Sequence, residues 1–88
     1  MRMKTNFNGA VPLSQLQAGQ RGRVAAPAAD EEIPRRLQDL GFVPGTPLEI
    51  RRRAPLGDPV EIELRGYRLC LRTDQLESVR VEVEDRGG

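Results

Sequence analysis

Few side chains in this sequence could carry enzyme chemistry. Its 88 residues contain no histidine and a single cysteine, Cys70. Without an imidazole, no serine or cysteine can be activated by the histidine base that nucleophilic enzymes most often use. No glycine-rich phosphate loop precedes a predicted helix. We therefore expect a protein that is not an enzyme and that holds no cofactor.

Cys70 is the one thiol of the chain. Arg68 and Arg72 lie two residues to either side of it and share its face of a predicted strand, so these cations could activate the thiol. A redox-active thiol usually works beside a resolving cysteine, which this sequence lacks. We therefore favour the interpretation that Cys70 is a small residue on the less buried face of the strand, without a redox role.

Asp30, Glu31 and Glu32 form a compact acidic group that could bind a hard cation through carboxylate oxygens. The same residues are favourable at the start of a helix, where the helix dipole attracts negative charge, and we favour this second interpretation. A transition metal would find no imidazole and only Cys70 as a soft donor. The sequence therefore predicts no preformed metal site.

Arg51, Arg52 and Arg53 form the densest basic run, and such a run could contact phosphates. More often such a run is a solvated strand end, and here it would face Glu61 and Glu63 across a hairpin. The whole chain carries 14 basic and 13 acidic residues, a net charge of +1. This balance argues against binding that is dominated by phosphate contacts.

The segment of residues 54–59 is unlike an ordinary hairpin loop. Two prolines restrict its backbone, a glycine frees it, and its leucine has no obvious helix or strand partner. The leucine could fold back as a core plug, or it could belong to a preformed apolar contact surface, and we weigh the two evenly. The candidate partner-binding residues are Ala54, Pro55, Leu56, Gly57, Asp58 and Pro59.

A second candidate site lies at the corner where a predicted helix ends. Leu37 and Leu40 are three residues apart and share one helical face. Gly41 is typical of the left-handed position after a helix, and Phe42 falls where a Schellman cap brings it against Leu37. A Pro-Gly pair two residues later predicts a type II turn. The candidate partner-binding residues here are Leu37, Leu40, Gly41, Phe42 and Val43.

The helix that leads into this corner is predicted to be short and amphipathic. Residues 30–32 would lie at its N-terminus, and Pro34 in its first turn, where the missing N–H does least harm. Ile33, Leu37 and Leu40 then form an apolar stripe with i, i+4, i+7 spacing.

Alternation of apolar and polar residues predicts five strands. They cover residues 21–25, 48–51, 60–64, 67–72 and 79–83. A sheet this small avoids exposed edges best by closing on itself. We therefore predict a mainly β fold, a closed five-stranded barrel with one short helix between strands 1 and 2. The domain spans residues 12–84, between flexible tails at residues 1–11 and 85–88.

The compartment can be inferred from the same sequence. One cysteine excludes an internal disulfide and suits a reducing cytoplasm. No apolar run approaches the roughly 20 residues that a membrane helix needs. The first ten residues carry charges but no apolar segment of a secretory signal. We expect a cytoplasmic protein.

Four segments, taken in order, resemble the FeoA family, small proteins of the bacterial ferrous-iron uptake system. They are residues 19–24, 37–45, 54–59 and 66–72, and the resemblance covers residues 13–84. It implies an SH3-like barrel, in agreement with the predicted strands. It also implies a partner, the FeoB permease, whose GTP-binding part faces the cytoplasm.

We therefore expect an accessory protein that binds FeoB and supports or regulates ferrous-iron import. Such a protein would meet the membrane only through FeoB and would bind no nucleic acid, and it could form a homo-oligomer. An arginine of the 51–53 run could be imagined as an arginine finger toward the GTP-binding part, but the sequence gives no geometry to support that role. The alternative is a small RNA-binding β-barrel, which would rest on Arg21, Arg23 and the same run.

Overall fold

A computed structural model of the protein describes residues 10–84. Short strands dominate it, and only three short helical segments interrupt them. In chain order the elements are β1 (Ala10–Pro12), the 3-10 turn η2 (Leu13–Gln15), β2 (Arg21–Val24), α1 (Arg35–Leu40), β3 (Pro47–Arg53), β4 (Val60–Leu64), β5 (Tyr67–Leu71), α2 (Thr73–Leu76) and β6 (Arg80–Val83).

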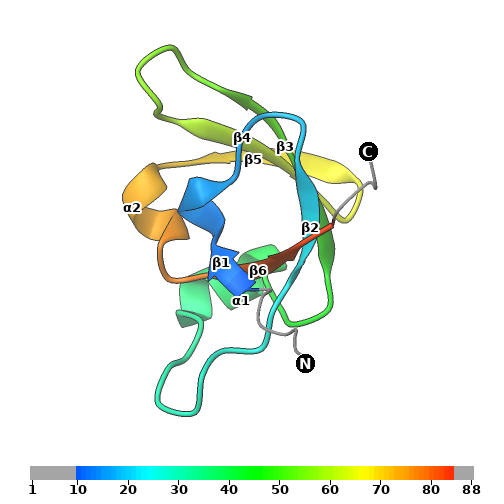
Figure 1. The fold of residues 1–88 in the computed structure, drawn as a ribbon, viewed down its shortest axis with the longest axis vertical. Helices are drawn as coiled ribbons and strands as arrows, with labels where there is room; N and C mark the ends of the chain where they lie inside the picture. The colour runs from blue at the N-terminus through cyan, green and yellow to red at the C-terminus, as the bar shows by residue number, and fades with distance from the viewer. Residues whose placement is uncertain (1–9, 85–88) are drawn as a thin grey trace, which may run out of the picture.

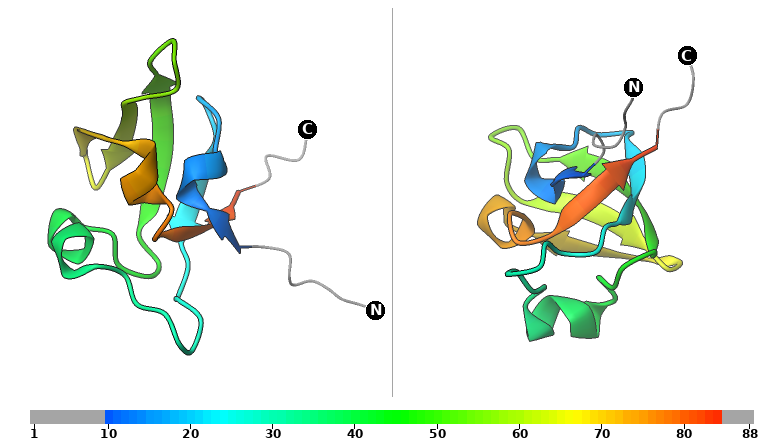
Figure 2. Two further views of the ribbon diagram at one scale, coloured as in Figure 1. Left: turned by 90° about the vertical axis from the view of Figure 1, so that its left-hand side faces the viewer. Right: turned by 60° about the horizontal axis from the view of Figure 1, so that its bottom comes forward.

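The strands form one antiparallel sheet that bends around a single core (Figures 1 and 2). Its order is β1-β6-β2-β3-β4-β5. The mainly β, SH3-like fold class is confirmed, but the sheet has six strands instead of five and is not closed. The 3-10 turn η2 follows the edge strand β1, and the short helix α2 follows the other edge strand, β5. The two lie side by side, and their buried leucines, Leu13 and Leu76, complete the core there (Figure 1).

Strand β1 is the element that the sequence pattern did not reveal. Ala10 and Val11 fall in the predicted N-terminal tail, but they pair with Glu82 and Val81 of β6, so the tail boundary at residue 11 is wrong. A three-residue strand is too short to show a periodicity of its own, so it becomes visible only through its partner. The remainder of the two predicted tails lies outside the described residues.

Helix α1 begins later than predicted. Pro34 is its N-cap, with an extended backbone at ψ 140°, and residues 30–32 precede the helix instead of starting it. A proline disfavours helical geometry in the residue before it, so Ile33 cannot extend the helix backwards. Ile33 is still buried in the core, but Leu40 is not, so the predicted stripe of three residues is wrong at Leu40.

The end of α1 follows the prediction. Gly41 has a left-handed backbone with φ 116°, and the Phe42 N–H donates to the Leu37 carbonyl oxygen at 3.0 Å, as in a Schellman cap. Leu37 and Phe42 are both buried in the core. The chain therefore leaves the helix in a fixed direction and enters β3 after a tight turn, in which Thr46 N–H donates to Val43 O at 3.1 Å.

The core is aliphatic apart from one aromatic ring. Every strand except β1 contributes at least one buried side chain to it. Gly22 allows β2 to approach β6 closely, because a Cβ at this position would lie 2.5 Å from the Glu82 carbonyl oxygen. The buried hydrophobic residues are Leu13, Leu16, Val24, Ala25, Ile33, Leu37, Phe42, Leu48, Ile50, Val60, Ile62, Leu64, Leu71, Leu76, Val79 and Val81.

Candidate partner-binding site

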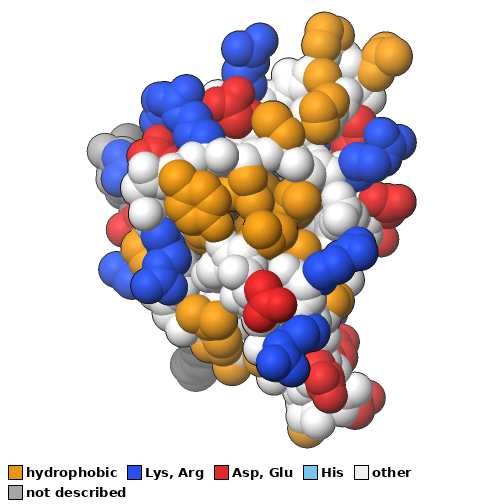
Figure 3. All heavy atoms as spheres, turned by 180° about the vertical axis from the view of Figure 1, so that it is seen from behind, with side chains coloured by type: hydrophobic (Ala, Val, Ile, Leu, Met, Phe, Trp, Pro, Cys, Tyr) orange, Lys and Arg blue, Asp and Glu red, His pale blue; other side chains and the backbone are white. Residues whose placement is uncertain are grey.

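The loop between β3 and β4, residues 54–59, projects from the end of the sheet (Figure 1). The side chain of Leu56 at its tip is 97% exposed. The core-plug interpretation of Leu56 is therefore wrong. Hydrophobic side chains gather at this tip, at the upper right of Figure 3, where they stand clear of the rest of the molecule. We name residues 54–59 the apolar loop.

The backbone of the apolar loop is held by its own hydrogen bonds. Ala54 N–H donates to the Pro59 carbonyl oxygen at 3.1 Å, and Gly57 N–H donates to the Ala54 carbonyl oxygen at 2.8 Å. Gly57 has φ 97°, which a glycine adopts without a Cβ penalty. These bonds close the base of the loop and leave Pro55 and Leu56 at its exposed tip.

A carboxylate ties the loop to the next helical turn. One carboxylate oxygen of Asp58 accepts the backbone N–H of Thr73 at 2.7 Å and also accepts the Thr73 hydroxyl. These hydrogen bonds, with smaller help from the nearby Arg72 and Arg53 charges, hold the pKa of Asp58 below its ordinary value of 3.8. Asp58 is thus a structural anchor at neutral pH, since its ionised form is the one that accepts both bonds.

The corner at the end of α1 is built differently. Leu37 and Phe42 face the core, so neither side chain is available to a partner. Leu40 is 36% exposed and Val43 is partly buried. The Tyr67 hydroxyl donates to the Leu40 carbonyl oxygen, and the tyrosine itself is 43% exposed. An open hollow lies here, lined by Gln38, Asp39, Leu40, Gly41, Val43, Arg65 and Tyr67.

Tyr67 is the residue of this corner that sequence reasoning missed as a surface feature. The alternation of β5 places Tyr67, Leu69 and Leu71 on one side, and of these only Leu71 is buried. Because β5 is an edge strand, the core covers one end of it and leaves the other end open. The signal that could have placed Tyr67 here is its hydroxyl. The last carbonyl oxygens of a helix lack partners within the helix, and a nearby hydroxyl can donate to one of them.

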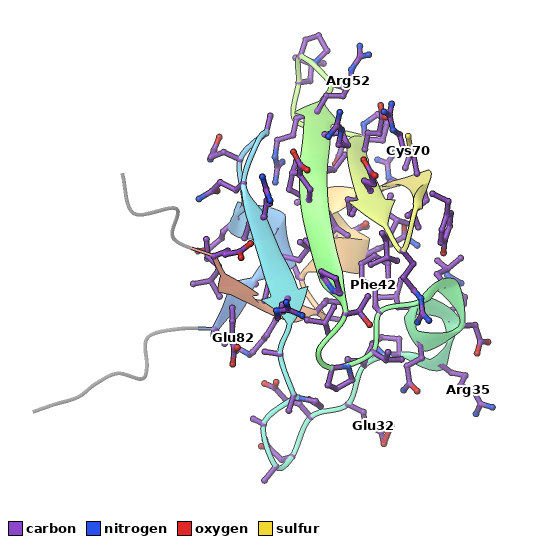
Figure 4. All side chains as sticks on the ribbon, turned by 90° about the vertical axis from the view of Figure 1, so that its right-hand side faces the viewer. Glu32, Arg35, Phe42, Arg52, Cys70 and Glu82 are labelled. Atoms are coloured by element: carbon purple, nitrogen blue, oxygen red, sulfur yellow. The ribbon has the colours of Figure 1, made fainter. Side chains whose placement is uncertain are left out.

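The two predicted contact segments do not form one surface. The corner precedes β3 and the apolar loop follows it, so the seven-residue strand separates them by about 20 Å at 3.3 Å per residue. Figure 4 shows Phe42 near one end of β3 and Arg52 near the other. A partner would have to span the molecule to contact both at once.

The basic run of β3 divides into three different environments. Arg51 lies between Glu49 and Glu63, with nitrogen–oxygen distances of 3.3 and 3.6 Å. Arg52 is exposed and points outward in Figure 4. Arg53 is partly buried and donates to backbone carbonyl oxygens. The expected pairing with Glu63 is confirmed for Arg51.

Glu61, the other predicted partner of the run, is bound elsewhere. Its carboxylate lies 3.2 Å from Arg68 of the neighbouring strand β5. The prediction that Glu61 faces the basic run is confirmed in the β3–β4 register, where its Cα lies opposite Arg52, although the carboxylate pairs with Arg68. Cross-strand neighbours on either side compete for one carboxylate, and the register alone does not decide between them.

Residues considered for redox or metal chemistry are spread over the surface. Cys70 is exposed on β5, on the opposite side from the buried Leu71. Glu31 lies 3.4 Å from Arg80, an exposed ion pair between the α1 approach and β6. Within residues 10–84, no group of three or more histidine, cysteine, aspartate or glutamate side chains is placed to hold a metal ion. Nor does any helix in that part of the chain have the length and apolar character to cross a membrane.

The fold and its short helices define a small SH3-like β domain, and its relatives identify it further. The FeoA domain profile matches residues 11–83. The chain belongs to the FeoA family, which is linked to ferrous-iron transport. The match extends through β6 and includes both the corner and the apolar loop.

Solved structures of similar proteins share the architecture. An FeoA-like protein from Clostridium acetobutylicum superposes with a TM-score of 0.81 and is 29% identical, with 93% of this chain and 95% of that chain covered. FeoA from Stenotrophomonas maltophilia, solved in complex with zinc and described as a procaryotic SH3 domain protein, gives a TM-score of 0.68 at 28% identity, covering 88% and 99%.

A longer relative joins this kind of domain to a transporter. The Fe(2+) transport protein A/Fe(2+) transporter FeoB fusion protein of Porphyromonas gingivalis is 28% identical over 71 residues. That alignment covers 81% of this chain but only 8% of the relative. The chain therefore spans a small part of a protein in which an FeoA part and an FeoB part are covalently linked.

Proposed function

We propose that this chain is a non-enzymatic accessory protein that binds the GTP-binding part of the FeoB permease and supports or regulates ferrous-iron uptake from the cytoplasmic side. The observation that carries the proposal is the relative in which FeoA and FeoB parts share one chain. A covalent link keeps two parts at a high effective concentration, which is useful when they work together.

The apolar loop is the surface that we assign to this contact. Leu56 is 97% exposed on a projecting tip, so a partner can bury it only by supplying a concave apolar pocket. Burying a leucine side chain contributes about 1.5–3 kcal/mol. The backbone bonds of the loop reduce the ordering cost of binding, because the tip is already shaped.

The corner is the second surface to be considered. Its exposed apolar side chains are Leu40 and Tyr67, beside an open hollow. Each is already more than half covered, so each leaves less area for a partner to bury than Leu56 does. We therefore rank the corner below the apolar loop as the contact with FeoB.

The test compares matched aspartate substitutions in the full chain, titrated against the GTP-binding domain of FeoB. Leu56→Asp should weaken binding by at least about 2 kcal/mol, or about 30-fold, because it would place an unpaired charge in the pocket. Leu40→Asp should weaken it less, and Ala28→Asp, on an exposed turn away from both surfaces, should leave it unchanged. Circular dichroism melting of each variant provides the folding control.

Each outcome bears on a different part of the proposal. If Leu40→Asp has the larger effect, the corner is the contact and the assignment of the apolar loop is wrong. If the wild-type chain does not bind the GTP-binding domain, the proposed partner is wrong. Retention of the chain on RNA that falls steeply with added salt would instead favour the RNA-binding alternative.

A further inference from the structure

The guanidinium of Arg53 joins the apolar loop to a distant turn of the chain. Its Nε donates to the Leu16 carbonyl oxygen at 3.0 Å, and Nη2 donates to the Ser14 carbonyl oxygen. Its Nη1 donates to the Gly57 carbonyl oxygen at 3.2 Å, within the apolar loop. Arg53 is the last residue of β3. One side chain therefore connects the strand end, the η2 turn and the loop.

The attachment is specific to the shape of arginine. Three backbone oxygens from two segments are reached by donors that lie in one plane, and only a guanidinium presents such a fork. A lysine at this position would keep the charge but could not bridge the same oxygens. Arg53 is thus unlike its neighbour Arg52, whose exposed side chain makes no hydrogen bond or ion pair within the described residues.

A second attachment holds the apolar loop at the residue after Gly57. Asp58 accepts two hydrogen bonds from Thr73, the first residue of α2. Arg53 binds at Gly57, directly before Asp58. The two contacts therefore fall on neighbouring residues, immediately after Leu56, and link the loop to η2 and α2, which lie side by side.

We propose that Arg53 and the Asp58–Thr73 pair are positioning residues that keep the apolar loop in the one shape that presents Leu56 to a partner pocket. This role rests on the proposed binding function for its purpose, but its physical basis can be tested in the free chain. The same contacts argue against phosphate binding by Arg53, because its N–H donors are directed at backbone oxygens.

The first experiment measures amide hydrogen exchange in the free, full-length chain. The reporters are the N–H groups of Ala54 and Gly57, which form the internal bonds of the loop. Arg53→Gln should speed their exchange by about tenfold or more, because charge-assisted hydrogen bonds at the loop base are lost. Arg52→Gln is the matched control on the same strand and should change the exchange by less than about twofold.

Two further variants keep the result interpretable. Arg53→Lys retains the charge, so faster exchange in this variant identifies the fork geometry as the cause, and unchanged exchange contradicts our proposal. Thr73→Ala removes one hydrogen bond to Asp58 and should by itself speed the exchange of the same two N–H groups. If Arg53→Gln melts at a much lower temperature, these milder variants decide the question.

The second experiment is a double-mutant cycle with Leu56→Ala, read as affinity for the FeoB GTP-binding domain. If Arg53 acts only through Leu56, Arg53→Gln weakens binding of the wild type but adds less than about twofold once Leu56 is truncated. An equal loss in both backgrounds would show that Arg53 contacts the partner itself and would overturn the positioning role. Absence of any binding would refute the proposed partner, while hydrogen exchange would still decide whether Arg53 positions the loop.

Discussion

The two ends of β3 use similar residues to opposite effect. Before the strand, a turn with a proline and a glycine follows Phe42, whose ring is fully buried. After the strand, a loop with prolines and a glycine carries Leu56, whose side chain is almost fully exposed. The difference lies in what covers each turn. At the corner, residues of α1 and β4 pack around the turn. The apolar loop instead projects beyond the ends of β3 and β4, where no other element within residues 10–84 covers it (Figures 1 and 4).

The largest test of this contrast is a pair of matched truncations. Phe42→Ala should lower the free energy of unfolding by about 3–5 kcal/mol, because it opens a cavity in a small core. Leu56→Ala should change it by less than about 0.5 kcal/mol, the usual range for surface sites. Urea denaturation of the two variants measures both values. Similar losses at the two positions would show that the corner and the loop are equally part of the core.

Two glycines with left-handed backbones sharpen the comparison. Gly41 has φ 116°, and an added Cβ would lie 3.0 Å from a Leu64 methyl carbon. Gly57 has φ 97° with no atom within 4 Å of such a Cβ. Both alanine variants incur the backbone cost of about 1–2 kcal/mol, and Gly41→Ala adds a steric cost. Thermal melting should therefore place Gly41→Ala below Gly57→Ala, and the reverse order would contradict the packing difference.

The smallest expected effect is the pH dependence of the loop anchor. Hydrogen bonds from Thr73 lower the pKa of Asp58 in the folded chain below 3.8. The folded state therefore binds this proton less readily than the unfolded state, so the anchor is fully present above pH 3.8 and is lost as the pH falls through the lower folded-state pKa. Asp58→Asn should remove this contribution to the acid dependence of the denaturation midpoint. An unchanged pH profile would mean that the carboxylate does not anchor the loop.

Much of the fold was predictable because its signals are local. The five strands from β2 to β6 show alternation within or directly beside their own residues, and Gly41 marks the helix end through its backbone preference. The start of α1 was predicted too early, although Pro34 carried the needed signal, since a residue before proline avoids helical geometry. Both candidate contact segments were also located from composition, but their distance from each other was not.

The mainly β class, the helix stop at Gly41 and the presence of an unusual proline-rich loop all follow from the amino-acid sequence. Each of these depends on interactions within a few residues. Tertiary structure alone decided that β1 joins β6, that Leu56 faces outward and that Arg53 binds the carbonyl oxygens of Leu16 and Gly57. Those features depend on which distant segments become neighbours, and a linear pattern does not encode that proximity in any one stretch of residues.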